Sequence, residues 1–137
     1  MMKVLRLFAI ILLFINGAAA LAGGASLIGD PSGEAMGWKT EMLEHSPFDN
    51  YLMPGVILLT VNGLLSLITA VLTIKKNKIY TSYIILQGAV LCGWIITEIM
   101  MIRLYHPLHF IFLAVGLLLI VCGYILSAIA PLTVVKT

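Results

Sequence analysis

Charged side chains are scarce in this chain: aspartate, glutamate, lysine and arginine make up only 10% of its 137 residues. Soluble domains carry about 25% charged residues because they need a hydrated surface, so a water-soluble globular protein is excluded. The net charge of +2 is too small to indicate nucleic-acid binding. Apolar side chains instead make up 61% of the chain and give a mean hydropathy of +1.11. This composition predicts an integral membrane protein surrounded by a lipid bilayer.

Cysteine and catalytic motifs are also lacking. The two cysteines, Cys92 and Cys122, lie inside apolar runs and form no C-x-x-C pair, so we expect them to be packing residues and not redox or zinc ligands. The sequence has no Walker loop, nucleophile elbow or H-E-x-x-H motif. We therefore expect a non-enzymatic protein without a cofactor.

The apolar residues are concentrated in four segments long enough to cross a bilayer as helices, which takes about 20 residues each. The predicted spans are residues 4–22, 56–74, 80–102 and 108–130. Residues 75–78 and 103–107 are turns so short that the helices on either side must run antiparallel. The predicted fold class is all-α, a single four-helix transmembrane domain (residues 1–137) forming an up-and-down bundle.

The first span has a second interpretation. Lys3 and Arg6, followed by an apolar run and small residues, are also typical of a secretory signal peptide. Its cleavage motif would be Ala18-Ala19-Ala20 or Ala20-Leu21-Ala22. Cleavage would leave three spans in unchanged orientation.

The segment between the first two spans, residues 23–53, has a different composition. Its charged residues are five acids and one base: Asp30, Glu34, Glu41, Glu44 and Asp49 against Lys39. Asp30-Pro31-Ser32-Gly33 predicts a tight turn. Residues 38–44 predict one or two helical turns, with Trp38 as an anchor at the membrane interface.

The basic residues predict the topology. Lys3, Arg6, Lys75, Lys76, Lys78 and Lys136 fall on one side of the predicted bundle, and Lys39 and Arg103 on the other. Cytoplasmic loops carry the excess of lysine and arginine. Both termini are therefore predicted to be cytoplasmic, and the acidic loop extracytoplasmic.

Helical spacing predicts which faces point into the bundle. In the third span the inward face is Tyr80, Tyr83, Gln87, Leu91, Trp94 and Glu98, and the opposite face holds the small residues Ser82, Ala89, Gly93 and Thr97. Inward faces of the second and fourth spans are Asn62, Ser66, Thr69 and Thr73, and His109, Phe112, Gly116, Ile120, Gly123 and Ser127. The candidate polar interior is accordingly Glu98, Gln87, Asn62, Trp94 and His109.

Glu98 is the most unusual of these residues, since a carboxylate within a span needs a partner or a function. One interpretation is structural, in which it reaches the interface or accepts a hydrogen bond; the other is proton or ligand handling. It lies near the outer end of its span, at nearly the depth of His109. We expect Glu98 to pair with His109, or with Arg103 folding back.

Three histidines lie on the predicted outer side: His45, His106 and His109. Together with an acidic residue they have the chemistry of a zinc or copper site. The spacing is a weak signal, and we expect no metal.

Several short motifs carry a family resemblance. D-P-S-G at residues 30–33, S-P-F-D-N-Y-L-M-P-G at 46–55, V-N-G at 61–63 and the W-x-x-x-E of Trp94 and Glu98 resemble a family of small four-span bacterial inner-membrane proteins. The resemblance covers most of the chain. It implies a bacterial inner-membrane location and a four-helix fold, and it carries no activity or functional residue.

Three functions follow as hypotheses. The first is a non-enzymatic membrane component, either a homo-oligomer or an accessory subunit, that presents its outer loop to a partner membrane protein. The second is a small solute or proton-coupled transporter with Glu98, Gln87 and Asn62 along its path. The third, ranked last, is a metal-dependent enzyme of the outer face or a metal handler that uses the three histidines.

Overall fold

The computed structural model describes the backbone of residues 1–103 and 106–134, and the side chains up to residue 129. The described residues form helices and turns without strands, and the fold is a bundle of four helices long and apolar enough to cross a membrane. These are α1 (Met2–Gly29), the second span, α4 (Tyr80–Ile102) and α5 (Pro107–Val134). The second span is continuous but has three parts, α2 (Leu52–Ile57), η3 (Leu58–Leu64) and α3 (Leu65–Ile74). The predicted all-α bundle is confirmed.

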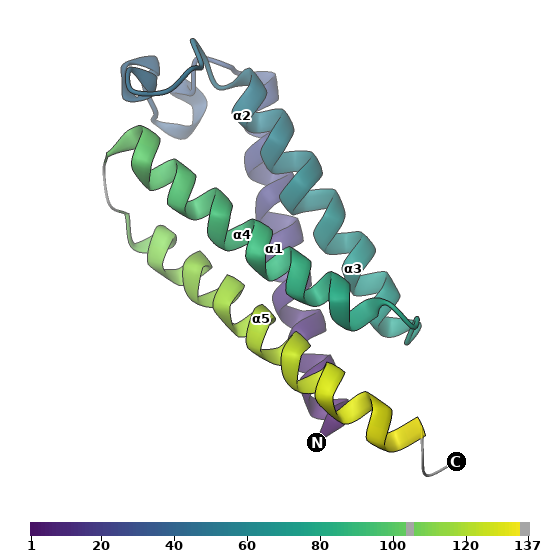
Figure 1. The fold of residues 1–137 in the computed structure, drawn as a ribbon. Coiled ribbons are helices and arrows are strands. Elements are labelled where there is room, and N and C mark those ends of the chain that lie inside the picture. Colours follow the sequence, from purple (N-terminus) through teal and green to yellow (C-terminus); the bar gives the residue numbers. More distant parts are fainter. Residues whose placement is uncertain (104–105, 135–137) are drawn as a thin grey trace.

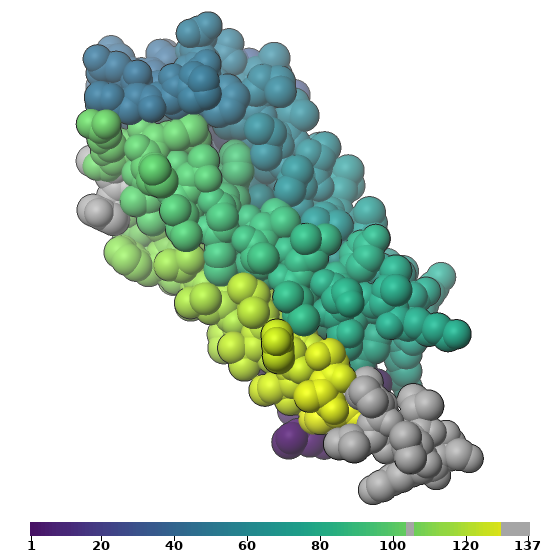
Figure 2. All heavy atoms as spheres, in the orientation of Figure 1, coloured from purple at the N-terminus to yellow at the C-terminus, as the bar shows by residue number. Residues whose placement is uncertain are grey.

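The start of α1, the turn after α3 and the end of α5 lie at one end of the bundle (Figure 1). The opposite end carries residues 30–51, which we call the outer cap. The cap contains two short 3₁₀ helices, η1 (Glu34–Met36) and η2 (Thr40–Leu43). The space-filling view shows the cap (blue) seated directly on the end of α4 (green) (Figure 2).

Three predicted boundaries were wrong. The first helix extends seven residues beyond residue 22, to Gly29, so the connection occupies residues 30–51 and not 23–53. The second span starts at Leu52 and not at residue 56, which places Pro54 in its first turn, where its missing N–H is tolerated. Pro131, expected to end the last helix, lies within α5, which continues to Val134. A proline there removes a single hydrogen bond from the last turn.

Contact between glycines explains the longer first helix. A Cβ atom on Gly24 would lie 2.8 Å from the Gly55 carbonyl oxygen, and one on Gly55 would lie 2.8 Å from Leu27 Cβ. Glycine costs about 1 kcal/mol within a helix relative to alanine. Here it lets α1 and α2 pack at backbone distance, which keeps residues 23–29 helical.

The second span contains a π-helix that the sequence did not predict. Residues Leu58–Leu64 form i→i+5 hydrogen bonds between two ordinary α-helical segments. Asn62 and Gly63, both in this segment, are buried. π segments are rare and frequently lie at functional sites, so this part of the helix is a candidate for a specific role.

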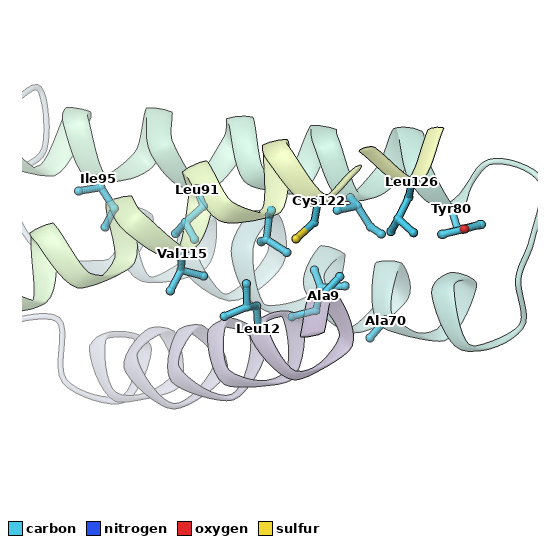
Figure 3. Packing of buried hydrophobic residues seen from close by; sticks show 12 residues of the cluster. Ala9, Leu12, Ala70, Tyr80, Leu91, Ile95, Val115, Cys122 and Leu126 are labelled. Atoms are coloured by element: carbon cyan, nitrogen blue, oxygen red, sulfur yellow. The ribbon is translucent and has the colours of Figure 1, made fainter. Parts of the chain in front are cut away.

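The interior is filled by apolar side chains from all four spans (Figure 3). The labelled residues of this cluster are Ala9, Leu12, Ala70, Tyr80, Leu91, Ile95, Val115, Cys122 and Leu126. Large apolar side chains on the outside, including Ile68, Ile96 and Ile111, are about half exposed. An apolar exterior around a filled interior is what a lipid environment requires, and the chain is a multi-pass membrane protein.

Candidate functional site

Tyr51 is the centre of the outer cap. Its side chain is 2% exposed and packs with Leu27 and Leu43, and its ring lies 5.4 Å from that of Trp38 between centroids. The Tyr51 hydroxyl donates to the Lys39 carbonyl at 2.8 Å, and its backbone N–H donates to the Pro31 carbonyl at 2.8 Å. The cap is therefore a folded unit whose small core is completed by Leu27 at the end of α1.

The predicted turn at residues 30–33 is held by Asp30. Its carboxylate accepts hydrogen bonds from the Ser32 hydroxyl at 2.5 Å and from the Ala35 N–H at 2.9 Å. The Ser32 hydrogen bond is the larger cause of a lowered Asp30 pKa, and the Ala35 N–H adds to it. Gly33 follows with a φ of +79°, and a Cβ there would lie 2.8 Å from the Tyr51 ring. The D-P-S-G motif thus forms a turn shaped to fit Tyr51.

Four of the five acidic side chains of the cap point outward. The side chains of Glu34, Glu41, Glu44 and Asp49 are all exposed. Lys39 is the one basic residue of the cap and is also exposed. The cap therefore combines a buried aromatic core with an acidic outer surface.

Glu98 lies beneath this cap. It lines a small cavity together with Trp94 and Met101 of α4 and with Trp38, Leu43 and Tyr51 of the cap. The cavity volume is about 10 Å³, at the lower limit for holding one water molecule. Trp94 lies one helical turn before Glu98 and lines the same cavity. Glu98 is thus enclosed by apolar and aromatic groups on the cap side.

The expected pair of Glu98 with His109 is present. His109 Nε2 lies 3.6 Å from Glu98 Oε2, and both side chains are largely buried. His109 Nδ1 accepts the His106 backbone N–H at 3.2 Å, so that nitrogen carries no proton and Nε2–H faces the carboxylate. Among the described residues, Arg103 makes no ion pair with Glu98, so the alternative partner was wrong.

A second polar group lies in the middle of the bundle. Asn16 of α1 donates to the Ser66 hydroxyl oxygen at 2.7 Å. Gln87 of α4 donates to Asn62 Oδ1 at 3.4 Å. All four side chains are buried, and those of Asn62, Ser66 and Gln87 lie on the faces predicted to point inward.

The two polar groups are separate. Gln87 and Glu98 are eleven residues apart on α4, which corresponds to roughly 16 Å along a helix axis. The inward positions between them are occupied by Leu91 and Ile95, which are buried in the apolar core. The structure does not bring Glu98, Gln87 and Asn62 together as one continuous polar path.

The three histidines do not form a cluster with acidic residues. His45 is exposed on the cap, while the rings of His106 and His109 lie edge to face near the start of α5, with centroids 6.4 Å apart. In the described part of the chain, no group of three or more histidine, cysteine, aspartate or glutamate residues is arranged to hold a metal ion. His106 instead accepts the Leu108 N–H at 3.1 Å through Nδ1 and caps the helix start.

Sequence reasoning missed Tyr51 and the π-helix. The sequence around Tyr51 contains a signal that could have identified it as a packing residue. Tyr51 lies between Ser46-Pro47, which favours a turn, and Pro54-Gly55, which favours a helix start. The π-helix had no specific signal: Thr60, Val61, Asn62 and Gly63 are poor helix formers, but their order does not indicate i→i+5 hydrogen bonds.

Comparisons with known proteins add no further identification: no family model, no curated protein and no solved structure matched this chain. The fold and site therefore define the class by themselves, a small four-helix multi-pass membrane protein with a folded acidic cap. Membership of the bacterial family suggested by the short motifs stays a prediction.

Proposed function

We propose that this protein is a non-enzymatic accessory component of the bacterial inner membrane that presents its acidic outer cap to a partner membrane protein. The observation that carries the proposal is the cap itself. Its acidic residues are exposed on a unit fixed by the buried Tyr51 and its two hydrogen bonds. A preorganised surface loses little conformational freedom on binding. The partner surface that suits it is basic, because complementary charge speeds association and selects the partner.

The orientation in the membrane is part of this proposal. The end of the bundle opposite the cap carries Lys3, Arg6 and the lysines of residues 75–78. By the positive-inside rule this end faces the cytoplasm and the cap faces outward. A membrane-impermeant thiol reagent on intact cells should label Lys39→Cys and not Lys78→Cys, in a background without the native cysteines. The reverse pattern would refute the orientation.

A second surface supports association within the membrane. Ser82, Ala89, Gly93 and Thr97 form the predicted small-residue face of α4, and all four are exposed. A Cβ on Gly93 would meet nothing within 4 Å. Small residues let membrane helices approach closely, so this face suits a helix of the partner or of a second copy.

Photocrosslinking in native membranes tests the accessory function. A photoreactive residue at Glu41 in the cap should give one discrete adduct, and the same residue at Lys78 should not. Replacing Glu34 and Glu44 with glutamine should reduce the adduct without changing protein abundance. A cap position that gives no adduct, or an adduct that is indifferent to the loss of both charges, would refute acidic docking.

The alternative, a small solute or proton-coupled transporter, is favoured by one observation, the enclosed Glu98–His109 pair. The cavity at Glu98 is about 10 Å³ in volume, and Leu91 and Ile95 separate it from Gln87. A single protomer therefore offers less support for this function than for docking. Proton uptake by reconstituted liposomes that Glu98→Gln abolishes would favour the transporter, whereas equal uptake by the two proteins and empty liposomes would exclude it.

A further inference from the structure

Two side-chain amides meet in the middle of the bundle with only part of their hydrogen bonds made. Asn62 on η3 and Gln87 on α4 are both 0% exposed. The bond from Gln87 Nε2 to Asn62 Oδ1 is 3.4 Å long, beyond the usual range for such bonds. Asn62 Nδ2 and Gln87 Oε1 have no partner among the described residues. The contact thus contains one unpaired donor and one unpaired acceptor.

Exchanging the oxygen and nitrogen atoms of the two amides does not remove this imbalance. If Asn62 alone were turned over, two N–H groups would face each other. If both were turned over, Asn62 would become the donor, leaving an oxygen of Asn62 and a nitrogen of Gln87 unpaired. In each arrangement that keeps the bond, one donor and one acceptor need a partner.

No protein group among the described residues bonds these two atoms, and lipid cannot do so. The hydrocarbon of a bilayer has no polar groups, so buried amides must be satisfied inside the protein. Asn16 is already bonded to Ser66, and the Thr69 hydroxyl donates to the Leu65 carbonyl at 2.7 Å. Neither of these side chains is charged.

The backbone marks the same place independently. Asn62 belongs to the π-helix Leu58–Leu64, in the middle of the second span. Such segments are rare and are frequently found at functional sites. Unpaired amides and an irregular helix therefore coincide at one residue.

We propose that Asn62 and Gln87 bind one water molecule, which accepts a hydrogen bond from Asn62 Nδ2 and donates one to Gln87 Oε1. Water fits this site because it is donor and acceptor at once. A cation would leave Nδ2 unpaired, and an anion would leave Oε1 unpaired. The Ser66 hydroxyl lies one turn after Asn62 on the same face and can provide the third hydrogen bond that buried waters usually make.

This water joins the two halves of the bundle. Gly24 and Gly55 hold α1 against the second span, and Gly88 and Gly116 hold α4 against α5. The Asn62–Gln87 contact instead links the second span to α4. One hairpin is α1 with the second span, and the other is α4 with α5. The water satisfies the remaining hydrogen bonds of the polar contact between them.

Solid-state NMR of the ¹⁵N-labelled protein in lipid bilayers tests the site directly. Magnetisation should transfer from water to the side-chain amides of Asn62 and Gln87. The exposed backbone amides of the cap serve as the positive control, and the backbone amide of the buried Leu119 as the negative control. If the cap amides receive magnetisation and neither side-chain amide does, the two amides bond each other directly and the proposal is overturned.

A variant separates a held water from ordinary proton exchange. Gln87→Met keeps the side-chain length and removes the acceptor, so the transfer to Asn62 should fall at least several-fold. Undiminished transfer to Asn62 in this variant would show that Gln87 holds no water and would overturn the proposal. If Gln87→Met does not fold, the measurement on the unaltered protein still decides whether water is bound.

Discussion

Gly88 of α4 and Gly116 of α5 bring their helices into backbone contact. A Cβ on Gly88 would lie 2.6 Å from the Gly116 carbonyl oxygen, and one on Gly116 would lie 2.6 Å from Cys92 Sγ. Helices in a bilayer associate mainly through such close packing, because lipid is as apolar as the helix surface. The α4–α5 hairpin therefore depends on the absence of side chains at these two positions.

The glycine contact predicts that Gly88→Ala destabilises the protein. The added methyl group must push α5 away, and overpacking of this kind costs about 1–3 kcal/mol. Unfolding in mixed detergent micelles, followed by circular dichroism, measures the loss. Gly93→Ala is the matched control, because its Cβ meets nothing within 4 Å. Equal stability of the two variants would contradict the contact.

The outer cap predicts a difference between its two left-handed glycines. Gly33 and Gly37 have φ angles of +79° and +74°, so alanine is strained at both, at a cost of about 1–2 kcal/mol each. At Gly33 the methyl group also meets the Tyr51 ring, whereas at Gly37 nothing lies within 4 Å. Limited proteolysis should cut residues 30–51 faster in Gly33→Ala than in Gly37→Ala. Similar cleavage of the two variants would argue against the Tyr51 contact.

Tyr51→Phe should loosen the cap without unfolding the bundle. The change removes the hydroxyl that donates to the Lys39 carbonyl, and a lost hydrogen bond of this kind costs about 0.5–1.5 kcal/mol. Hydrogen–deuterium exchange should become faster in residues 30–51 and stay unchanged in α4. Tyr124→Phe, at an exposed position on α5, serves as the control and should alter neither region.

Asp30 predicts an acid-sensitive cap. Its pKa in the folded protein lies below the ordinary value of 3.8, because Ser32 and Ala35 donate to the ionised carboxylate. A lowered pKa contributes stability that is present above pH 3.8 and is lost as the pH falls through the lower folded value. Trp38 fluorescence in a Trp94→Phe background should report the opening of the cap as the pH falls. Asp30→Asn should remove this contribution, and an identical acid profile for both proteins would refute it.

Glu98 predicts a contrast between two substitutions. Glu98→Gln keeps an oxygen near His109 Nε2, which lies 3.6 Å from Glu98 Oε2, whereas Glu98→Ala leaves that N–H donor without a polar group beside it and enlarges the cavity beneath the cap. The unpaired donor costs about 1–3 kcal/mol, so the alanine variant should melt at a lower temperature than the glutamine variant. If the melting temperature of Glu98→Gln is close to that of the unaltered protein, the side chain at this position has a structural role that does not need its charge. Equal losses in both variants would show that its charge matters.

The inward faces could be predicted because they depend on local information. Asn62, Ser66, Thr69 and Thr73 repeat at helical spacing, and a bilayer excludes such groups from its apolar surface. The same reasoning placed Gln87 and Glu98 inside and brought His109 to the depth of Glu98. All of these placements agree with the structure.

The sequence by itself determined a membrane bundle of four helices, because apolar length and helical period act within each segment. Only the tertiary structure decided the extension of α1 to Gly29, the π-helix at Asn62 and the burial of Tyr51. The extension of α1 and the burial of Tyr51 each depend on a contact between residues distant in the chain, Gly24 with Gly55 and Gly33 with Tyr51. Local composition does not specify which distant backbone will come within 3 Å, so these features appear only once the helices are packed.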